Sequence, residues 1–320
     1  MLCLLKASLT KTLREVPENT FIVPYRPAHT LQHEEAANMC QISLLPAIHE
    51  IESLVKSHLI SPLCSILTKR VESHIAKIHR GTYIESCSVD NSGEYSFVQD
   101  NMVVLYESIS QDILSHVPKE YGAMIASNIA TYSIYCFVTN ASLVRPLGEM
   151  GRLRITQDLA DFELTLEQLL LKAGESSSLS QISGGKPYAE LRAVRQMLFW
   201  SGLENKDLSA ESAAKAFFRE VWVKDVRPST AFHFLFSFAP KLLSSPHHSN
   251  RMAADQYAKT LVKVDGSTED GEARAWMSTI TCCDAYQQRE SVDNTKSDGD
   301  RRVPAILMII GPELLRRRRQ

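Results

Sequence analysis

The clearest pattern of hydrophobic and polar residues in this chain lies between Asn140 and Leu171. Large apolar residues recur there at spacings of four, three, four and three, namely Ile155, Leu159, Phe162, Leu166 and Leu169. These spacings place them on one face of an α-helix with 3.6 residues per turn. The preceding segment Arg145-Pro146-Leu147-Gly148 interrupts a helix, because proline lacks the amide donor and restricts the residue before it. The pattern therefore predicts a helix, a corner and a second helix.

The apolar stripe at residues 155 to 169 has two interpretations. The simpler one is that it faces the core of the chain's own helical bundle. The other is that it forms a docking or binding face for another molecule. We favour the core interpretation, and the docking face stays as the alternative.

Similar helical stripes occur along most of the chain. They run through residues 44–59, resume after Pro62, and return after the polar, turn-rich segment 82–97. Pro118 is placed to open the helix that leads into the corner at residue 145. There is no alternation of strands and helices and no repeat of fixed period. We therefore expect an all-α protein with tandem helical bundles in a rod-like, multi-helix arrangement.

One aromatic stretch leaves the choice between strand and helix less clear. Phe232, Phe234, Phe236 and Phe238 are spaced by two, which is the period of a strand. The residues on either side favour a helix, and we predict a helix here.

Changes in composition predict the domain organisation. Residues 1–30 carry three prolines with little periodicity and are expected to form an irregular lead-in, followed by a helical bundle at 31–172. A Ser/Gly-rich segment at 173–186 is predicted to be a linker. A C-terminal helical bundle at 187–320 follows, and it contains a charged linker at 289–302 and ends in a polybasic tail.

Composition and charge exclude few classes of protein. With 320 residues, 44% of them hydrophobic and 22% charged, the chain is able to bury a sizeable core. A net charge of −2 gives no general attraction to nucleic acid or to an anionic membrane. Seven scattered cysteines without a C-x-x-C pair favour a reducing, cytosolic setting. The apolar runs at 1–5 and 303–310 are too short for a signal peptide or for a membrane span of about 20 residues.

Motifs that would carry enzymatic or metal chemistry are weak. His29 and His33 have a helical spacing, but no third metal ligand is fixed by the sequence. The segment Ser183-Gly184-Gly185-Lys186 lacks the first glycine of a phosphate-binding loop, and Pro187 stands where Ser or Thr is needed. No nucleophile has an evident histidine partner. We expect no catalytic residue, no cofactor, no metal and no small-molecule substrate.

Two sets of arginines are candidate contacts for a partner or a membrane. The C-terminal set, which follows Leu314 and Leu315, comprises Arg316, Arg317, Arg318 and Arg319. Guanidinium groups beyond a short apolar helix suit lipid or nucleic-acid phosphates, although a solvated chain terminus has the same composition. A second, weaker set comprises Arg152, Arg154, Arg192 and Arg195. These residues also fit the solvated face of packed helices.

Three segments in the same order resemble a known family. They are the run SLVRPLGEMGRLRITQDLADFEL at 142–164, the segment GKPYAELRAVRQMLF at 185–199 and the segment FLFSFAPKLLSSPH at 234–247. Together they are similar to the C-terminal region of subunit 5 of the conserved oligomeric Golgi complex. The resemblance covers the last 180 residues or so and does not include the family's long N-terminal helical region, so the chain is expected to correspond to a C-terminal portion.

This resemblance implies a function that the residues alone do not indicate. Members of the family are non-catalytic, largely helical subunits of a vesicle-tethering complex in retrograde transport within the Golgi. The chain is then expected to bind other subunits of that complex and to lie peripherally on the cytosolic face of the Golgi membrane. The alternative from a different class is a helical module that binds anionic lipid or nucleic acid through its C-terminal arginines.

Overall fold

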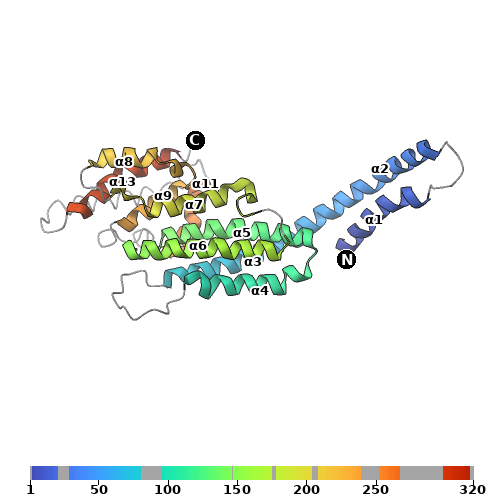
Figure 1. Ribbon diagram of the computed structural model, residues 1–320, viewed down its shortest axis with the longest axis horizontal. Coiled ribbons are helices and arrows are strands. Elements are labelled where there is room, and N and C mark those ends of the chain that lie inside the picture. The colour runs from blue at the N-terminus through green and yellow to red at the C-terminus, as the bar shows by residue number, and fades with distance from the viewer. Residues whose placement is uncertain are drawn as a thin grey trace. The chain divides into compact units, whose positions relative to one another are not determined.

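A computed structural model describes residues 2–20, 29–80, 96–145, 147–174, 178–203, 208–238, 252–266 and 298–317 (Figure 1). Within these ranges all regular secondary structure is helical, so the prediction of an all-α helical-bundle protein is confirmed. The chain divides into two compact units, Met1–Leu67 and Thr68–Gln320, and each is described by itself. The expected rod-like arrangement of tandem bundles stays a prediction.

The first unit is built on a pair of packed helices, α1 (Leu2–Thr20) and α2 (His29–Val55). The expectation of an irregular lead-in at 1–30 is wrong for residues 2–20. Leu2, Lys6, Leu9 and Leu13 recur at spacings of four, three and four and are partly buried, so they form one face of α1. Lys6 Nζ lies 2.8 Å from Glu52 Oε1 and ties α1 to α2.

A change of helix type precedes Pro62, where the sequence pattern predicts a break or kink. The π-helix η1 (Lys56–Ile60) follows α2, and α3 (Ser61–Ile75) follows η1. The Ser61 amide donates to the Lys56 carbonyl, five residues earlier, which is the bond of a π-turn. This wider turn accommodates a proline at the start of the next helix, and the division between the two units falls within α3.

The second unit begins with short elements that lead to a long central helix. The 3-10 helix η2 (Ala76–Arg80) ends the α3 segment, and π-helix η3 (Gln99–Val103), α4 (Val104–Asp112) and 3-10 helix η4 (Leu114–His116) follow. Helix α5 (Lys119–Ser142) starts directly after Pro118, as predicted. It packs against α6, α7, α9 and α11. Buried residues therefore occur around most of α5, as expected for a core helix.

Helix α6 (Glu149–Lys172) contains the predicted apolar stripe. All five stripe residues are at most 1% exposed, which assigns the stripe to the core of the second unit. The Phe162 ring stacks on Phe137 of α5 with 4.4 Å between ring centres and lies 6.4 Å from the Tyr106 ring of α4. Each of these large side chains contributes about 1.5–3 kcal/mol by leaving water.

The predicted linker at 173–186 forms an ordered turn over residues 178–186. This turn holds the 3-10 helix η5 (Ile182–Gly185), in which Ser183, Gly184 and Gly185 have φ values of 52°, 69° and 76°. A Cβ on Gly185 would lie 2.8 Å from the Ser180 carbonyl oxygen, so glycine is required there. The Thr131 and Ser183 hydroxyls lie 2.9 Å apart and join α5 to this turn.

Helix α7 (Lys186–Leu198) follows this turn and packs on both α5 and α6. The contact-based division at Leu67 and Thr68 therefore does not coincide with the predicted linker. The composition-based limits at 31–172 and 187–320 stay predictions.

The C-terminal helices surround the aromatic stretch. After the 3-10 helix η6 (Ser201–Leu203) come α8 (Ala210–Arg219) and the 3-10 helix η7 (Val221–Lys224). Helix α9 (Pro228–Leu235) and the 3-10 helix η8 (Phe236–Phe238) confirm the prediction of a helix. Every residue from Ser229 to Ser237 is buried, which explains why the phenylalanines do not show the usual helical period.

Two further helices, α11 (Ala254–Gly266) and α13 (Asp298–Arg317), complete the described fold. The prediction that the charged linker extends to residue 302 is wrong at its end, because α13 begins at Asp298 rather than at Val303. Acidic residues are favourable in the first turn of a helix, so a charged composition is compatible with helix there. The part of the predicted linker at 289–297 lies outside the described residues.

Candidate interaction surfaces

The second arginine set from the sequence lies on α6 and α7, where two of its four members make contacts that join neighbouring elements. The Arg152 guanidinium lies 4.2 Å from the centre of the Phe238 ring, and its Nη1 donates to the Ser237 carbonyl at 3.3 Å. Arg195 Nη1 donates to Glu163 Oε2 at 2.7 Å. These two residues hold α6 against η8 and α7. These contacts stabilise the fold, and a role of the two arginines in partner binding stays a prediction.

The other two members are placed differently. Arg154 is partly buried on α6. Arg192 is exposed on α7, with its guanidinium carbon 5.8 Å from the Tyr188 ring centre. The Tyr188 hydroxyl donates to Glu163 Oε1 at 2.8 Å, so this carboxylate serves both Tyr188 and Arg195. The structure thus gathers part of the set around Glu163 rather than into an open basic patch.

The C-terminal arginines begin on the last turn of α13, where one carboxylate binds two of them. Arg316 Nε and Arg317 Nε lie 2.8 Å and 3.0 Å from the Glu313 carboxylate oxygens. The Arg317 guanidinium also lies over the Phe218 ring, 4.2 Å from its centre. These arginines lower the pKa of Glu313 to about 2, so the carboxylate stays ionised at neutral pH. Arg318 and Arg319 lie outside the described residues.

Two partly buried arginines that the sequence pattern did not mark as sites, Arg227 and Arg145, hold the second unit together. Arg227, just before α9, places Nε 2.8 Å and 2.9 Å from the two carboxylate oxygens of Glu190 on α7. Its Nη2 donates to the Tyr135 carbonyl of α5 at 3.0 Å. Glu190 and Arg227 are 37 positions apart, so no local sequence pattern connects them.

Arg145 fixes the corner between α5 and α6. Its guanidinium donates to the carbonyl of Ser142 at 3.1 Å and to the carbonyls of Val144 and His233. Burial lowers the pKa of Arg145 to about 9, because the charged form loses hydration. Next to it, His233 Nε2 lies 2.9 Å from the Tyr257 hydroxyl and links α9 to α11. The corner predicted from Pro146 and Gly148 is therefore held by hydrogen bonds to backbone carbonyls.

The outer face of α6 carries a second set of apolar side chains, opposite the buried stripe. Their spacings follow the helical period over the whole helix. Its large members and their exposed fractions are Met150 (52%), Leu153 (44%), Leu164 (55%) and Leu171 (73%). We call these four residues the outer face of α6.

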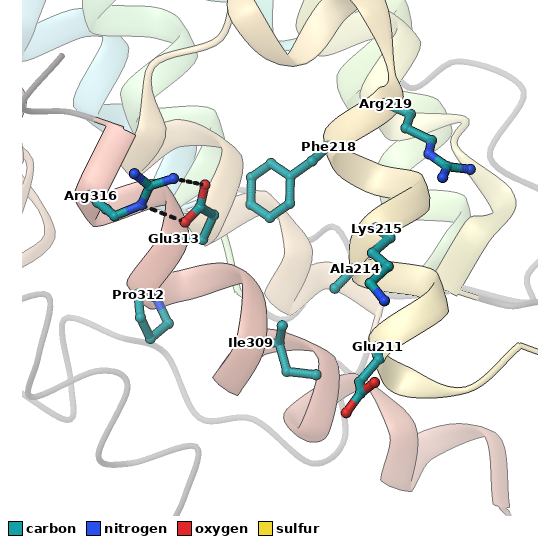
Figure 2. A pocket seen from close by; sticks show the side chains of 9 residues that line it. All are labelled: Glu211, Ala214, Lys215, Phe218, Arg219, Ile309, Pro312, Glu313 and Arg316. Carbon is teal, nitrogen blue, oxygen red and sulfur yellow. Dashed lines mark hydrogen bonds and ion pairs between the residues drawn. The ribbon is translucent and has the colours of Figure 1, made fainter.

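A groove of about 720 Å³ lies between α8 and α13 (Figure 2). Its floor is apolar and consists of Ala214, Phe218, Ile309 and Pro312. Ala214 is buried, Phe218 is half-buried, and Ile309 and Pro312 are exposed. The small Ala214 side chain leaves space beside the Phe218 ring.

Charged residues form the two edges of this groove. On α8 they are Glu211, Lys215 and Arg219, which follow one another at spacings of four along one side of the helix. On α13 they are Glu313 and Arg316, whose ion pair is visible at one end of the groove in Figure 2. The groove thus combines an apolar floor with charged edges.

Within the described ranges, the first being 2–20 and the last 298–317, no group of three His, Cys, Asp or Glu side chains is placed to hold a metal ion. Burial raises the pKa of Cys136 to about 12 and also raises that of Cys64, so both remain thiols at neutral pH and are poor nucleophiles. In the same ranges no helix is both long enough and apolar enough to cross a membrane.

These observations define an all-α, helical-bundle protein. Over 277 residues the chain is 27% identical to the Arabidopsis thaliana protein named conserved oligomeric Golgi complex subunit 5. The matched region covers 80% of this chain and 28% of that protein. Over 215 residues it is 30% identical to the Mus musculus protein of the same name, covering 64% of this chain and 22% of the relative.

The resemblance to this subunit is thereby confirmed. The chain spans about a quarter of the length of the curated relatives it matches. No family model and no solved structure matches the chain.

Proposed function

We propose that the chain is a non-catalytic scaffold subunit of a Golgi vesicle-tethering complex that acts in retrograde intra-Golgi transport. The observation that carries this proposal is the similarity to conserved oligomeric Golgi complex subunit 5 along 80% of the chain. The helical fold agrees with a binding role of this kind. In this proposal the chain lies peripherally on the cytosolic face of the Golgi membrane and binds other subunits of the complex.

The outer face of α6 is the surface we propose for a helix of another subunit. Met150 and Leu171 are 21 residues apart, so at 1.5 Å per residue the face extends over about 31 Å. Apolar side chains at helical spacing along this length suit a second helix packed beside α6. A helix that covers them removes several exposed large apolar residues from water.

Co-purification tests the proposed function. We expect the full chain, expressed with an affinity tag, to co-elute with the other subunits of the Golgi tethering complex and to sediment with Golgi membranes. Recovery of the chain alone, at monomer size and away from Golgi membranes, would contradict the proposal. The untagged chain competing for the same subunits provides the control for effects of the tag.

The alternative, binding of anionic lipid or nucleic acid through the C-terminal arginines, is less favoured. Glu313 already binds both Arg316 and Arg317, which offsets part of their positive charge. Replacement of Arg316, Arg317, Arg318 and Arg319 by Gln separates the two functions. We expect subunit association to remain. Loss of subunit association in this variant would instead assign the main contact to the arginines.

A further inference from the structure

The groove between α8 and α13 differs in charge from the rest of the chain. Lys215, Arg219 and Arg316 line it, and Arg317 lies over the Phe218 ring at its end. Against these four positive charges stand Glu211 and Glu313, which leaves a local excess of two positive charges. The whole chain has a net charge of −2. The groove is therefore a basic site on a slightly acidic protein.

The arrangement of side chains in the groove follows the geometry of its two helices. Ala214 and Phe218 are four residues apart on α8, and Ile309 and Pro312 are three apart on α13, so each helix supplies one apolar row. Lys215 and Arg219 form a parallel row on α8, outside the apolar one (Figure 2). An apolar strip thus has basic side chains along its α8 edge.

The dimensions of the groove suit a helix better than an enclosed small molecule. Helix α8 has 10 residues and is about 15 Å long, which corresponds to about three turns of a partner helix. The groove is partly open to solvent, and its lining side chains come from both helices (Figure 2). A small ligand bound at such a site would leave much of its own surface in water, whereas a helix uses only one face.

Among the described residues, the ion pairs at the groove lie on α13, and the basic side chains of the α8 edge are therefore the ones proposed to pair with a partner. Glu313 binds Arg316 and Arg317 on its own helix, which fixes these three residues at the α13 end. Lys215 and Arg219 are exposed. A partner's carboxylates that reach Lys215 and Arg219 gain ion pairs, whereas lysines there meet repulsion.

We propose that this groove binds an amphipathic helix of another protein whose apolar face is flanked by acidic residues. Leucine-sized side chains of that helix occupy the floor at Ala214, Phe218 and Ile309, and its carboxylates pair with Lys215 and Arg219. The proposal is independent of the Golgi function, because it rests on the groove's own geometry and charge.

Two synthetic peptides test the proposal on the full chain. Each has about 14 residues with leucines at helical spacing, and the flanking residues are glutamates in one peptide and lysines in the other. We expect the glutamate peptide to bind at least tenfold more tightly in fluorescence anisotropy. Its affinity should fall as salt is added, since exposed charge pairs are screened. Equal affinity for the two peptides would overturn the proposal.

Variants of the chain locate the binding site. Lys215→Glu combined with Arg219→Glu should reverse the preference and favour the lysine peptide. Ile309→Glu should abolish binding of the glutamate peptide, because it places a carboxylate in the apolar floor. Val221→Glu, at a residue 74% exposed and outside the groove, is the matched control and should bind normally. Circular dichroism melts show that each variant is folded. Normal binding by folded Ile309→Glu would overturn the proposal.

Vesicles test the competing occupant, an anionic membrane. Phosphatidylserine vesicles at the same salt concentration should bind the chain more weakly than the glutamate peptide does, and should not displace the peptide. If the vesicles displace the peptide, and if Arg316→Gln with Arg317→Gln removes vesicle binding while Ile309→Glu does not, the site is a membrane contact and the helix proposal is wrong.

Discussion

At the scale of single residues, an ion pair between a buried carboxylate and a partly buried arginine organises the second unit. Glu190 is 2% exposed, and its carboxylate receives hydrogen bonds from the backbone amide and Nε of Arg227. The Arg227 guanidinium also lies 4.9 Å from the Tyr135 ring centre. One ion pair thus joins α5, α7 and the start of α9. Desolvation offsets much of the attraction between the two charges of such a pair. The main effect of the Glu190–Arg227 pair is therefore to fix the relative positions of these helices.

Removal of one partner of this pair should be strongly destabilising. We expect Glu190→Gln to lower the free energy of unfolding by about 3 kcal/mol, because it leaves the partly buried Arg227 charge without a carboxylate. Urea denaturation measures the change. The matched control is Glu107→Gln, which removes an exposed ion pair with Lys172 and should cost about 0–1 kcal/mol. Similar losses in the two variants would show that the Glu190 pair has no special role.

The sequence pattern places Arg152, Arg154, Arg192 and Arg195 on helices, as observed, but does not identify their neighbours. Arg195 was interpreted as a member of a weak basic set, and the structure pairs it with Glu163, 32 positions away. Arg152 belongs to the same set, and its guanidinium lies over the Phe238 ring of a distant segment. Spacing along a helix shows which residues share a face, whereas the partner of a charge depends on how the helices pack. This is why Glu190 and Arg227 were not predicted as a pair.

At the scale of helices, α6 has two apolar faces that differ in exposure. The stripe that contains Leu159 was correctly predicted as a helical face from its spacing, and its burial selects the core interpretation. The outer face that contains Leu164 was not recognised. Its apolar residues are separated by Gln157, Asp161 and Gln168, so they form a weaker pattern. Helix α1 was not predicted, because three prolines within residues 1–30, of which only Pro17 lies in α1, are typical of an irregular segment.

Charge placed on either face of α6 should have different consequences. Leu159→Asp buries a carboxylate in the core and should cost about 4 kcal/mol or more, with loss of both the helical signal and subunit association. Leu164→Asp lies on the outer face, where the carboxylate stays in contact with water, so the melting temperature should be unchanged. The same substitution should weaken association with other subunits. Circular dichroism melts and a pull-down with those subunits measure both effects.

The control for this pair of variants is Val104→Asp, at a residue 63% exposed on α4. It should change neither the melt nor the association. An unchanged melt for Leu159→Asp would refute the core assignment of the buried stripe. Undiminished association of Leu164→Asp would remove the outer face of α6 from the proposed contact.

At the scale of the whole molecule, composition and contacts divide the chain differently. The Ser/Gly-rich segment near residue 180 was predicted to be a linker because such residues are common in flexible connections. A turn in which three successive residues have positive φ also favours serine and glycine, so the same composition occurs in an ordered turn. This turn packs against α5. The contact-based boundary instead lies in α3, where helical residues continue on both sides and composition gives no signal.

The two compact units should differ in their ability to fold alone. A fragment of residues 61–320 keeps all of α3, which begins with Ser61-Pro62, residue types that are favourable at the start of a helix. Its core includes Val71, Ile75 and Ile78, each 0% exposed, together with the buried stripe of α6. We expect this fragment to melt cooperatively, within about 4 °C of the full chain, which corresponds to a change of about 1 kcal/mol.

The complementary fragment of residues 1–60 should have little stable structure by itself. Among its described residues Val55 is fully buried, whereas Leu4, Met39 and Ile42 are 76%, 67% and 73% exposed. A pair of helices of this size buries too little apolar surface to offset its conformational entropy. We therefore expect a weak helical signal without a cooperative melt. A cooperative melt of this fragment, or a loss of more than about 4 °C in fragment 61–320, would show that the division into units does not describe how the chain folds.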